Sequence, residues 1–218
     1  MIYKNQINLP AAPTPNVPAP GTPAPTVPAP NPPSTPAFAG TITSEQLGLI
    51  SNLRQLWMQM AIWSRSLIVS TAANLADIQM ITDRLEYLPE AFSGVLNQYF
   101  EPHEADHFGE LLEEHISTVA ALIDAEKNND DRLVNQETVN LYSNANQIAA
   151  YLVSINSYWS EAEWRDLLND YIEMLLADLV ARLGGDYAKE IDIFDDLQTQ
   201  AIKIADYMAQ GMMQKFHP

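Results

Sequence analysis

Histidine and acidic side chains gather at residues 103–107 in a pattern that could bind a metal ion. His103 and His107 are four residues apart, and Glu104 completes the Glu-x-x-His motif that di-metal helical bundles use twice. No second Glu-x-x-His occurs in the chain. Because Pro102 suits the first position of a helix, both histidines fall in its first turns, and we interpret them as facing solvent. The alternative is a surface metal site at His103 and His107, and no cofactor is predicted.

Two polar residues lie inside apolar segments instead. Arg65 interrupts the apolar run of residues 56–69, and His115 falls on the apolar stripe of residues 108–123. A buried arginine must pair with a carboxylate, because an unpaired interior charge costs several kcal/mol. The candidate partners of Arg65 are Asp77, Asp206, Glu110 and Glu114, with Asn144 as a neutral contact.

We therefore predict a polar cluster inside the fold, formed by Arg65, Asp77, His115, Asn144 and Asp206. Two interpretations stay open, a structural ion-pair network and a site that binds a small ligand or moves a proton through His115. For His115 itself the simpler interpretation is a core histidine with one hydrogen bond. No paired acid–base signature appears, and the chain has no cysteine, so no catalytic residue is assigned.

The elements that must position these residues are helices. Capping boxes at Thr43 with Gln46 and at Ser160 with Glu163 mark two helix starts. The acids Glu163, Asp166, Asp170 and Glu173 have helical spacing, and we interpret them as a solvated helix face and not as a metal site. The remaining boundary signals predict helices over residues 102–128, 130–156, 160–184 and 186–215, with a short crossing helix over 89–100.

Apolar spacing gives the same division and shows no strand period. We predict an all-α fold, an up-and-down antiparallel bundle of four to five long helices plus the short crossing helix. The apolar stretch at residues 56–77 is not a membrane span, because its longest charge-free run has eleven residues and a span needs about 20. Since its apolar side chains point nearly all round, we expect it to be the most buried helix.

The first 40 residues have another composition. They hold twelve of the fifteen prolines, no acid and one charge, Lys4, and residues 13–32 contain an approximate ten-residue repeat. Such a segment favours extended polyproline II, so we predict a disordered arm over 1–40 and a helical domain over 41–218. The arm serves as a tether or, through its P-x-x-P spacing, as a ligand for a protein partner or for self-assembly.

Charge excludes several partners. Setting Lys4 aside leaves ten basic and 28 acidic side chains, a formal charge of −18 on the predicted helical domain. Nucleic acid and anionic lipid are therefore disfavoured. No apolar run of secretory length precedes the prolines, so the expected location is cytoplasmic.

Several segments of the sequence resemble those of a family of small helical proteins from spore-forming bacteria: IWSRSLIVSTAANLAD, FGELLEEHIS, NSYWSEAEW and ADYMAQGMMQKF. The resemblance covers most of residues 44–216, points to a spore-associated location, and implies no established activity. Family members often carry the label acetylglutamate kinase. A kinase of that class needs an α/β sheet and glycine-rich phosphate loops, whereas this chain has eight glycines and one adjacent pair, Gly184-Gly185, at a helix end. Kinase activity is not supported.

These observations favour a non-enzymatic structural or interaction protein, an acidic bundle whose polyproline tether reaches a protein partner or an assembly. The alternative is a ferritin-like bundle that binds a small ligand or a metal through the interior polar cluster around Arg65 and His115.

Overall fold

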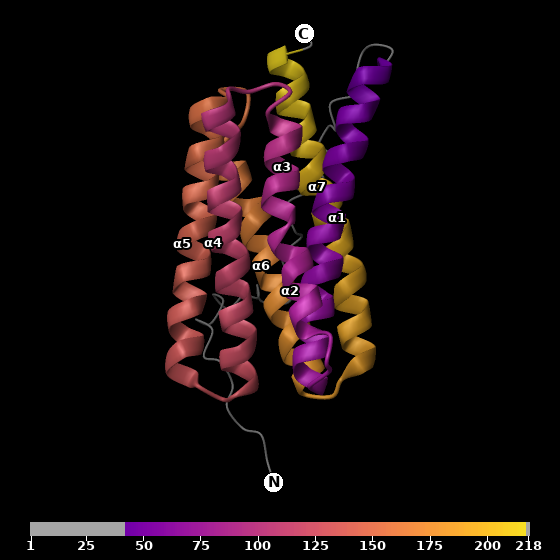
Figure 1. The fold of residues 1–218 in the computed structure, drawn as a ribbon, viewed down its shortest axis with the longest axis vertical. Coiled ribbons are helices and arrows are strands. Elements are labelled where there is room, and N and C mark those ends of the chain that lie inside the picture. Colours follow the sequence, from indigo (N-terminus) through magenta and orange to yellow (C-terminus); the bar gives the residue numbers. More distant parts are fainter. Residues whose placement is uncertain (1–41, 217–218) are drawn as a thin grey trace, which may run out of the picture. The chain divides into compact units, whose positions relative to one another are not determined.

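The computed structural model describes residues 42–216, which form helices joined by short connections, with no strand in that range (Figure 1). The predicted all-α bundle is confirmed. The arm at residues 1–40 lies outside the described residues. Five helices are long: α1 (Ser44–Ala73), α4 (Pro102–Lys127), α5 (Asp131–Ile155), α6 (Glu161–Leu183) and α7 (Tyr187–Phe216). Two are short: α2 (Ile78–Glu86) and α3 (Leu88–Leu96).

Consecutive helices run antiparallel and pack side by side, except that α3 continues α2, and α7 packs back against α1 to close the bundle (Figure 1). The short helix expected over residues 89–100 is present as α3, which packs against both α1 and α4. A second short helix, α2, comes before it, and α2 and α3 follow each other along α1 and together fill one position of the bundle. They are separate because Pro89 has no N–H to donate to the Leu85 carbonyl, so the α2 ladder ends at Glu86.

The helix caps follow the sequence in most places. The Thr43 capping box forms in full, and the Asp130 side chain accepts a bond from the Leu133 N–H at the start of α5. At α6 the predicted box is only half present. The Ser160 hydroxyl accepts from the Glu163 N–H, but the Ser160 N–H donates to the Tyr207 hydroxyl at 2.7 Å instead of to Glu163.

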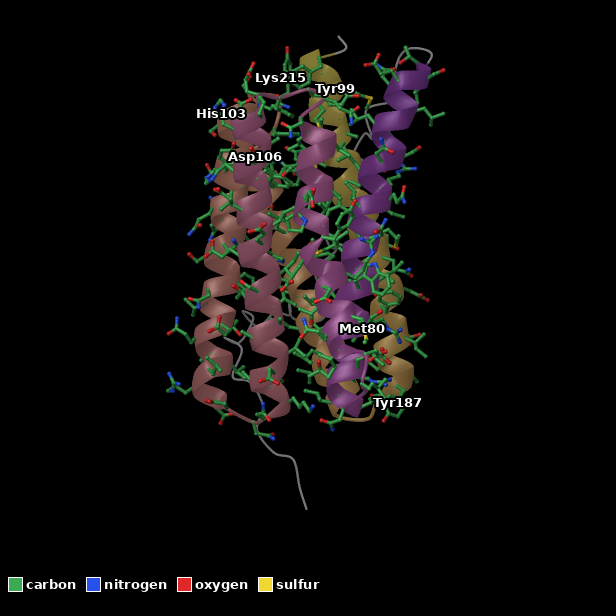
Figure 2. All side chains as sticks on the ribbon, viewed as in Figure 1. Met80, Tyr99, His103, Asp106, Tyr187 and Lys215 are labelled. Atoms are coloured by element: carbon green, nitrogen blue, oxygen red, sulfur yellow. The ribbon has the colours of Figure 1, made fainter. Side chains whose placement is uncertain are left out.

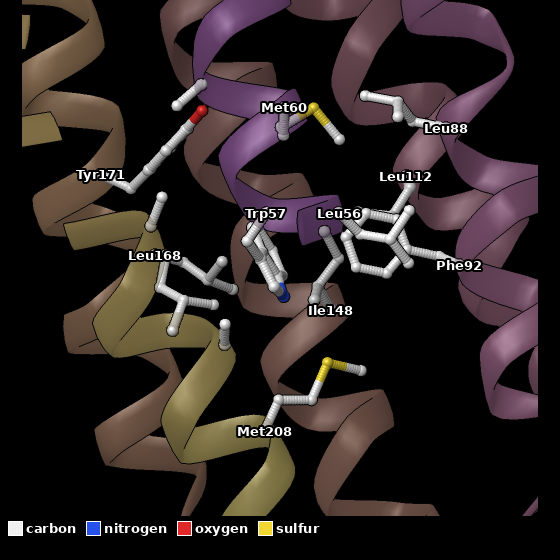
Figure 3. Close-up of a cluster of buried hydrophobic side chains, with 14 of the residues drawn as sticks. Leu56, Trp57, Met60, Leu88, Phe92, Leu112, Ile148, Leu168, Tyr171 and Met208 are labelled. Carbon is white, nitrogen blue, oxygen red and sulfur yellow. The ribbon is translucent and has the colours of Figure 1, made fainter. Parts of the chain in front are cut away.

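Large side chains from several helices meet in the core, as Figure 3 shows. Trp57 of α1 lies edge-on to Phe92 of α3 and to Tyr171 of α6, with ring centroids 5.3 and 6.4 Å away. Phe92 in turn contacts Phe108 of α4 at 5.9 Å. These rings join four helices in one apolar interior, where edge-to-face contacts add to area burial.

Helix α1 packs against α2, α3, α4, α6 and α7, so it has the predicted central place. It is not the most buried helix, however. Twelve of the 26 residues of α4 are buried, against eleven of the 30 in α1, because the first turns of α1 extend beyond their neighbours into solvent. As predicted, none of the helices within residues 42–216 is long and apolar enough to cross a membrane.

Candidate functional site

Arg65 of α1 forms an ion pair with Glu190, which lies in the first turn of α7. Nη2 of Arg65 lies 2.6 Å from Oε1 of Glu190, and the Glu190 side chain is only 1% exposed. The guanidinium also sits over the ring of Phe194, 4.7 Å from its centroid. Arg65 is therefore paired with a carboxylate, as predicted, but it remains 28% exposed and its partner was not among those expected.

A second arginine approaches the same carboxylate from α6. Nη1 of Arg182 lies 3.5 Å from Oε2 of Glu190, and its guanidinium lies 4.9 Å from the centroid of the Tyr187 ring. Each arginine thus has an aromatic face on one side and Glu190 on the other. Two partly desolvated cations compensate one buried anion, which ties the first turn of α7 to both α1 and α6.

Asp178 of α6 lies next to this pair and is fully buried, with no hydrogen-bond partner for either carboxylate oxygen in the described part of the chain. The pKa of Asp178 is raised to about 6, mainly by burial and then by the negative charge of Glu190, while Arg65 and Arg182 act in the opposite direction. We call Arg65, Asp178, Arg182 and Glu190 the ion cluster. Its least compensated member is Asp178.

His115 of α4 belongs to a different polar pair. Its Nδ1 lies 3.0 Å from Oδ1 of Asn144, whose Nδ2 donates to the Leu111 carbonyl at 3.0 Å. The bond to Leu111 shows which end of the Asn144 amide is nitrogen, so the atom that faces His115 is the amide oxygen. Because that oxygen can only accept a hydrogen bond, Nδ1 of His115 is the protonated ring nitrogen. Burial lowers the pKa of His115 more than the hydrogen bond raises it. His115 is thus the neutral, singly bonded core histidine that the sequence predicted.

The imidazole of His115 lines a closed internal cavity together with Ser64 of α1 and Tyr171 of α6. The cavity has no room for a water molecule. Burial raises the pKa of Tyr171 strongly, the nearby Ser64 side chain lowers it and the charge of Asp178 raises it. Three helices bring these polar groups together, but the space between them is too small for a substrate.

The structure does not gather the predicted polar cluster. Asp77 is exposed at the start of α2, and Asp206 forms a bidentate surface pair with Arg54, at 2.6 and 2.7 Å. Within residues 42–216 no hydrogen bond or ion pair joins Arg65 to His115. The two other expected partners of Arg65, Glu110 and Glu114, are exposed.

The two candidate metal-binding histidines lie on the surface. His103 and His107 are both exposed in the first turns of α4, as predicted, and Figure 2 shows His103 at the opposite end of the bundle from Tyr187. Nδ1 of His107 lies 2.8 Å from Oε2 of Glu110, and its ring packs against Tyr151. No group of three or more histidine or acidic side chains that could hold a metal ion occurs among the described residues.

A surface groove of about 580 Å³ runs between α1 and the α2–α3 pair. Arg84 lies in it, donates to Oε1 of Gln59 at 2.5 Å, and stacks on Tyr87 with 5.0 Å to the ring centroid. The other lining residues are mostly polar or small: Asn52, Gln55, Leu56, Glu90, Ala91, Gly94 and Val95.

Sequence reasoning missed Asp178, Arg182 and Glu190, although a signal was present. On α6 the buried positions Leu168, Tyr171 and Leu175 recur at steps of three and four, and the next step is Asp178. On α7 the buried stripe that holds Leu197 and Ala201 begins at Glu190, with the same steps of three and four residues.

The four acids predicted to form a solvated face do so, because Glu163, Asp166, Asp170 and Glu173 are all exposed. Buried acids such as Asp178 differ from these exposed acids in one feature that the sequence shows: their position continues the apolar stripe of the helix.

Comparison with known protein families, with curated proteins and with solved structures finds no match for this chain.

Proposed function

We propose that this chain is a non-enzymatic interaction protein, in which an acidic helical bundle engages a protein partner and the proline-rich arm extends its reach. The observation that carries the proposal is the closed interior. The internal cavity beside His115 has no room for a water molecule, so among the described residues this part of the core offers no place for a substrate. Recognition then falls to the outer surface.

One end of the bundle supports this proposal. The α1–α2 and α6–α7 connections lie at the same end, and Figure 2 shows Met80 and Tyr187 there. Leu75, Met80, Tyr187 and Ile191 are all exposed, between 45% and 67%. We call these four residues the apolar end. Exposed apolar side chains beside partly buried arginines are typical of the centre of a protein interface.

Charge defines the partner's chemistry. The helical domain carries ten basic and 28 acidic side chains, so a partner with a neutral or basic face is favoured over one that is acidic. By the resemblance to proteins of spore-forming bacteria, we place the partner in the cytoplasm of such a cell or in its spore.

The test uses the full chain, immobilised and exposed to an extract of its source cells. A captured protein is then purified, and its affinity is measured by calorimetry for the native chain and three variants. One variant has serine in place of the arm prolines, one combines Met80→Gln with Tyr187→Gln, and the control is Val139→Gln, which changes an exposed apolar residue of α5.

We expect the arm variant or the apolar-end variant to bind at least tenfold more weakly, with the Val139 variant within twofold of the native chain. A partner whose affinity is equal for all four proteins would contradict the proposal. So would a small molecule that the purified chain converts, if Arg65→Ala abolishes the conversion.

A further inference from the structure

Two buried carboxylates of the ion cluster have unequal surroundings. Glu190 receives both Arg65 and Arg182, at 2.6 and 3.5 Å. Asp178 is just as buried, yet among residues 42–216 neither of its oxygens has a hydrogen-bond or an ion-pair partner, whereas Glu190, whose Oε1 also lacks a hydrogen bond, has both ion pairs. Since the two arginines already serve Glu190, a negative charge on Asp178 is left without direct compensation.

The groups that act on Asp178 come from three helices. Arg65 of α1 and Arg182 of α6 attract its charge, and Glu190 of α7 repels it. On its own helix the Tyr171 hydroxyl is also buried and is influenced by the same charge. No group of α5, the third helix packed on α6, is among them. Desolvation and the charge of Glu190 therefore disfavour the ionised form of Asp178. The two arginines that favour it are in direct contact with Glu190 instead.

We propose that Asp178 is a proton-binding switch, which is neutral and holds α6 and α7 tightly against α1 in mildly acidic surroundings, and which loosens this end of the bundle when it ionises. As a neutral carboxyl, Asp178 gains an O–H that can donate a hydrogen bond, and its repulsion of Glu190 disappears. As a carboxylate it is a buried charge that has no direct hydrogen bond or ion pair and that repels Glu190.

The position of the switch gives it a mechanical consequence. Glu190 lies in the first turn of α7, directly after the connection in which Gly185 adopts a φ of 77°. The ion cluster thus links the first turn of α7 to α1 through Arg65 and Glu190. The same end of the bundle carries Tyr187 and Ile191, so loosening it changes the presentation of two exposed apolar side chains.

The direction of the effect follows from proton linkage. The folded chain holds the Asp178 proton up to a pH of about 6, whereas the unfolded chain releases it near a pH of about 3.9. The folded state therefore binds more protons between these values, and the contribution of Asp178 to stability falls as the pH rises through that window and stays low above it.

The experiment compares the full chain with Asp178→Asn, a neutral side chain of the same shape, in urea unfolding followed by tryptophan fluorescence at pH 4.5 and 7.5. At pH 7.5 we expect the variant to raise the folded-to-unfolded ratio at least tenfold over the native chain, and at pH 4.5 by no more than about fivefold. Amide hydrogen exchange at the start of α7, corrected for intrinsic rates, is expected to slow in the variant at pH 7.5 only.

The matched control is Asp170→Asn, which removes the same charge from an exposed position of the same helix. It is expected to change the ratio by less than twofold at either pH. An Asp178→Asn variant that is less stable than the native chain at both pH values would overturn the proposal. Independently of any variant, carbon-13 NMR of the native chain should show the Asp178 carboxyl titrating near pH 6, and a midpoint below about 4.5 would also overturn it.

Discussion

Gly211 of α7 lies against the indole of Trp159, in the connection before α6. A Cβ built on Gly211 would stand 2.0 Å from Nε1 of Trp159, far inside van der Waals contact. That same Nε1 donates to the Tyr207 carbonyl of α7 at 3.2 Å, so the indole is anchored and cannot move away cheaply. The glycine is required here by close approach, not by backbone conformation.

Gly211→Ala should therefore destabilise the bundle by about 2–4 kcal/mol, because the ring must move and lose its bond to Tyr207. The control is Gly48→Ala in α1, where nothing lies within 4 Å of the added Cβ. That change should stabilise by about 0.5–1 kcal/mol through helix propensity. Thermal and urea unfolding measure both, and equal effects would show that Trp159 does not block position 211.

Arg65→Ala should cost about 2–4 kcal/mol, since it leaves the buried Glu190 with only the longer contact to Arg182. Arg54→Ala breaks the exposed bidentate pair with Asp206 and should cost less than about 1 kcal/mol. Urea unfolding at neutral pH distinguishes them. Replacing Arg65 and Glu190 together by methionine should recover much of the loss, and failure to recover any would mean that the arginine stabilises through packing on Phe194.

Asn144→Ala should destabilise by about 2–4 kcal/mol, because it strands the Nδ1–H of His115 in the core and removes the second hydrogen bond of the Leu111 carbonyl. Asn135→Ala is the control on the same helix. Its exposed side chain bonds only to the carbonyl of Asp131 in its own helix, so the cost should be within about 0.5 kcal/mol. A small effect of Asn144→Ala would show that the pair is dispensable.

His115 should give the bundle a pH dependence opposite to that of Asp178. Burial lowers its folded pKa below the unfolded value of about 6.5, so the unfolded chain takes up a proton that the folded chain refuses. This contribution to stability is complete above that pH and is lost as the pH falls. Measured in an Asp178→Asn background, urea unfolding between pH 7.5 and 5 should show the loss, and adding His115→Gln should remove it. An unchanged pH profile would contradict a neutral His115.

Protein prepared with iron or manganese and then dialysed should retain well under one metal ion per chain. Di-metal bundles gather four carboxylates and two histidines, and no such group occurs among residues 42–216. Elemental analysis with oxygen-uptake measurements tests this. Two ions per chain, lost on changing His107 or His115, would place the protein among the oxidoreductases.

The sequence of each single helix indicates which of its polar residues lie in the interior. His115 and Arg65 interrupt apolar segments, and their buried or paired state follows from that position. Glu190 and Asp178 were overlooked, although each continues the stripe of its own helix, because acids elsewhere on α6 form an ordinary solvated face. What one helix cannot reveal is which side chain of another helix stands opposite.

Sequence alone determined the long helices, most of their caps and the all-α bundle, because capping and apolar periodicity act between residues only three or four positions apart. It also determined that Arg65 would need a carboxylate. Only the tertiary structure decided that this carboxylate is Glu190 of α7 and not Asp77 or Asp206. The choice depends on the rotation and axial offset of one helix against the next, which are set jointly by side-chain packing on several helices and by the lengths of their connections.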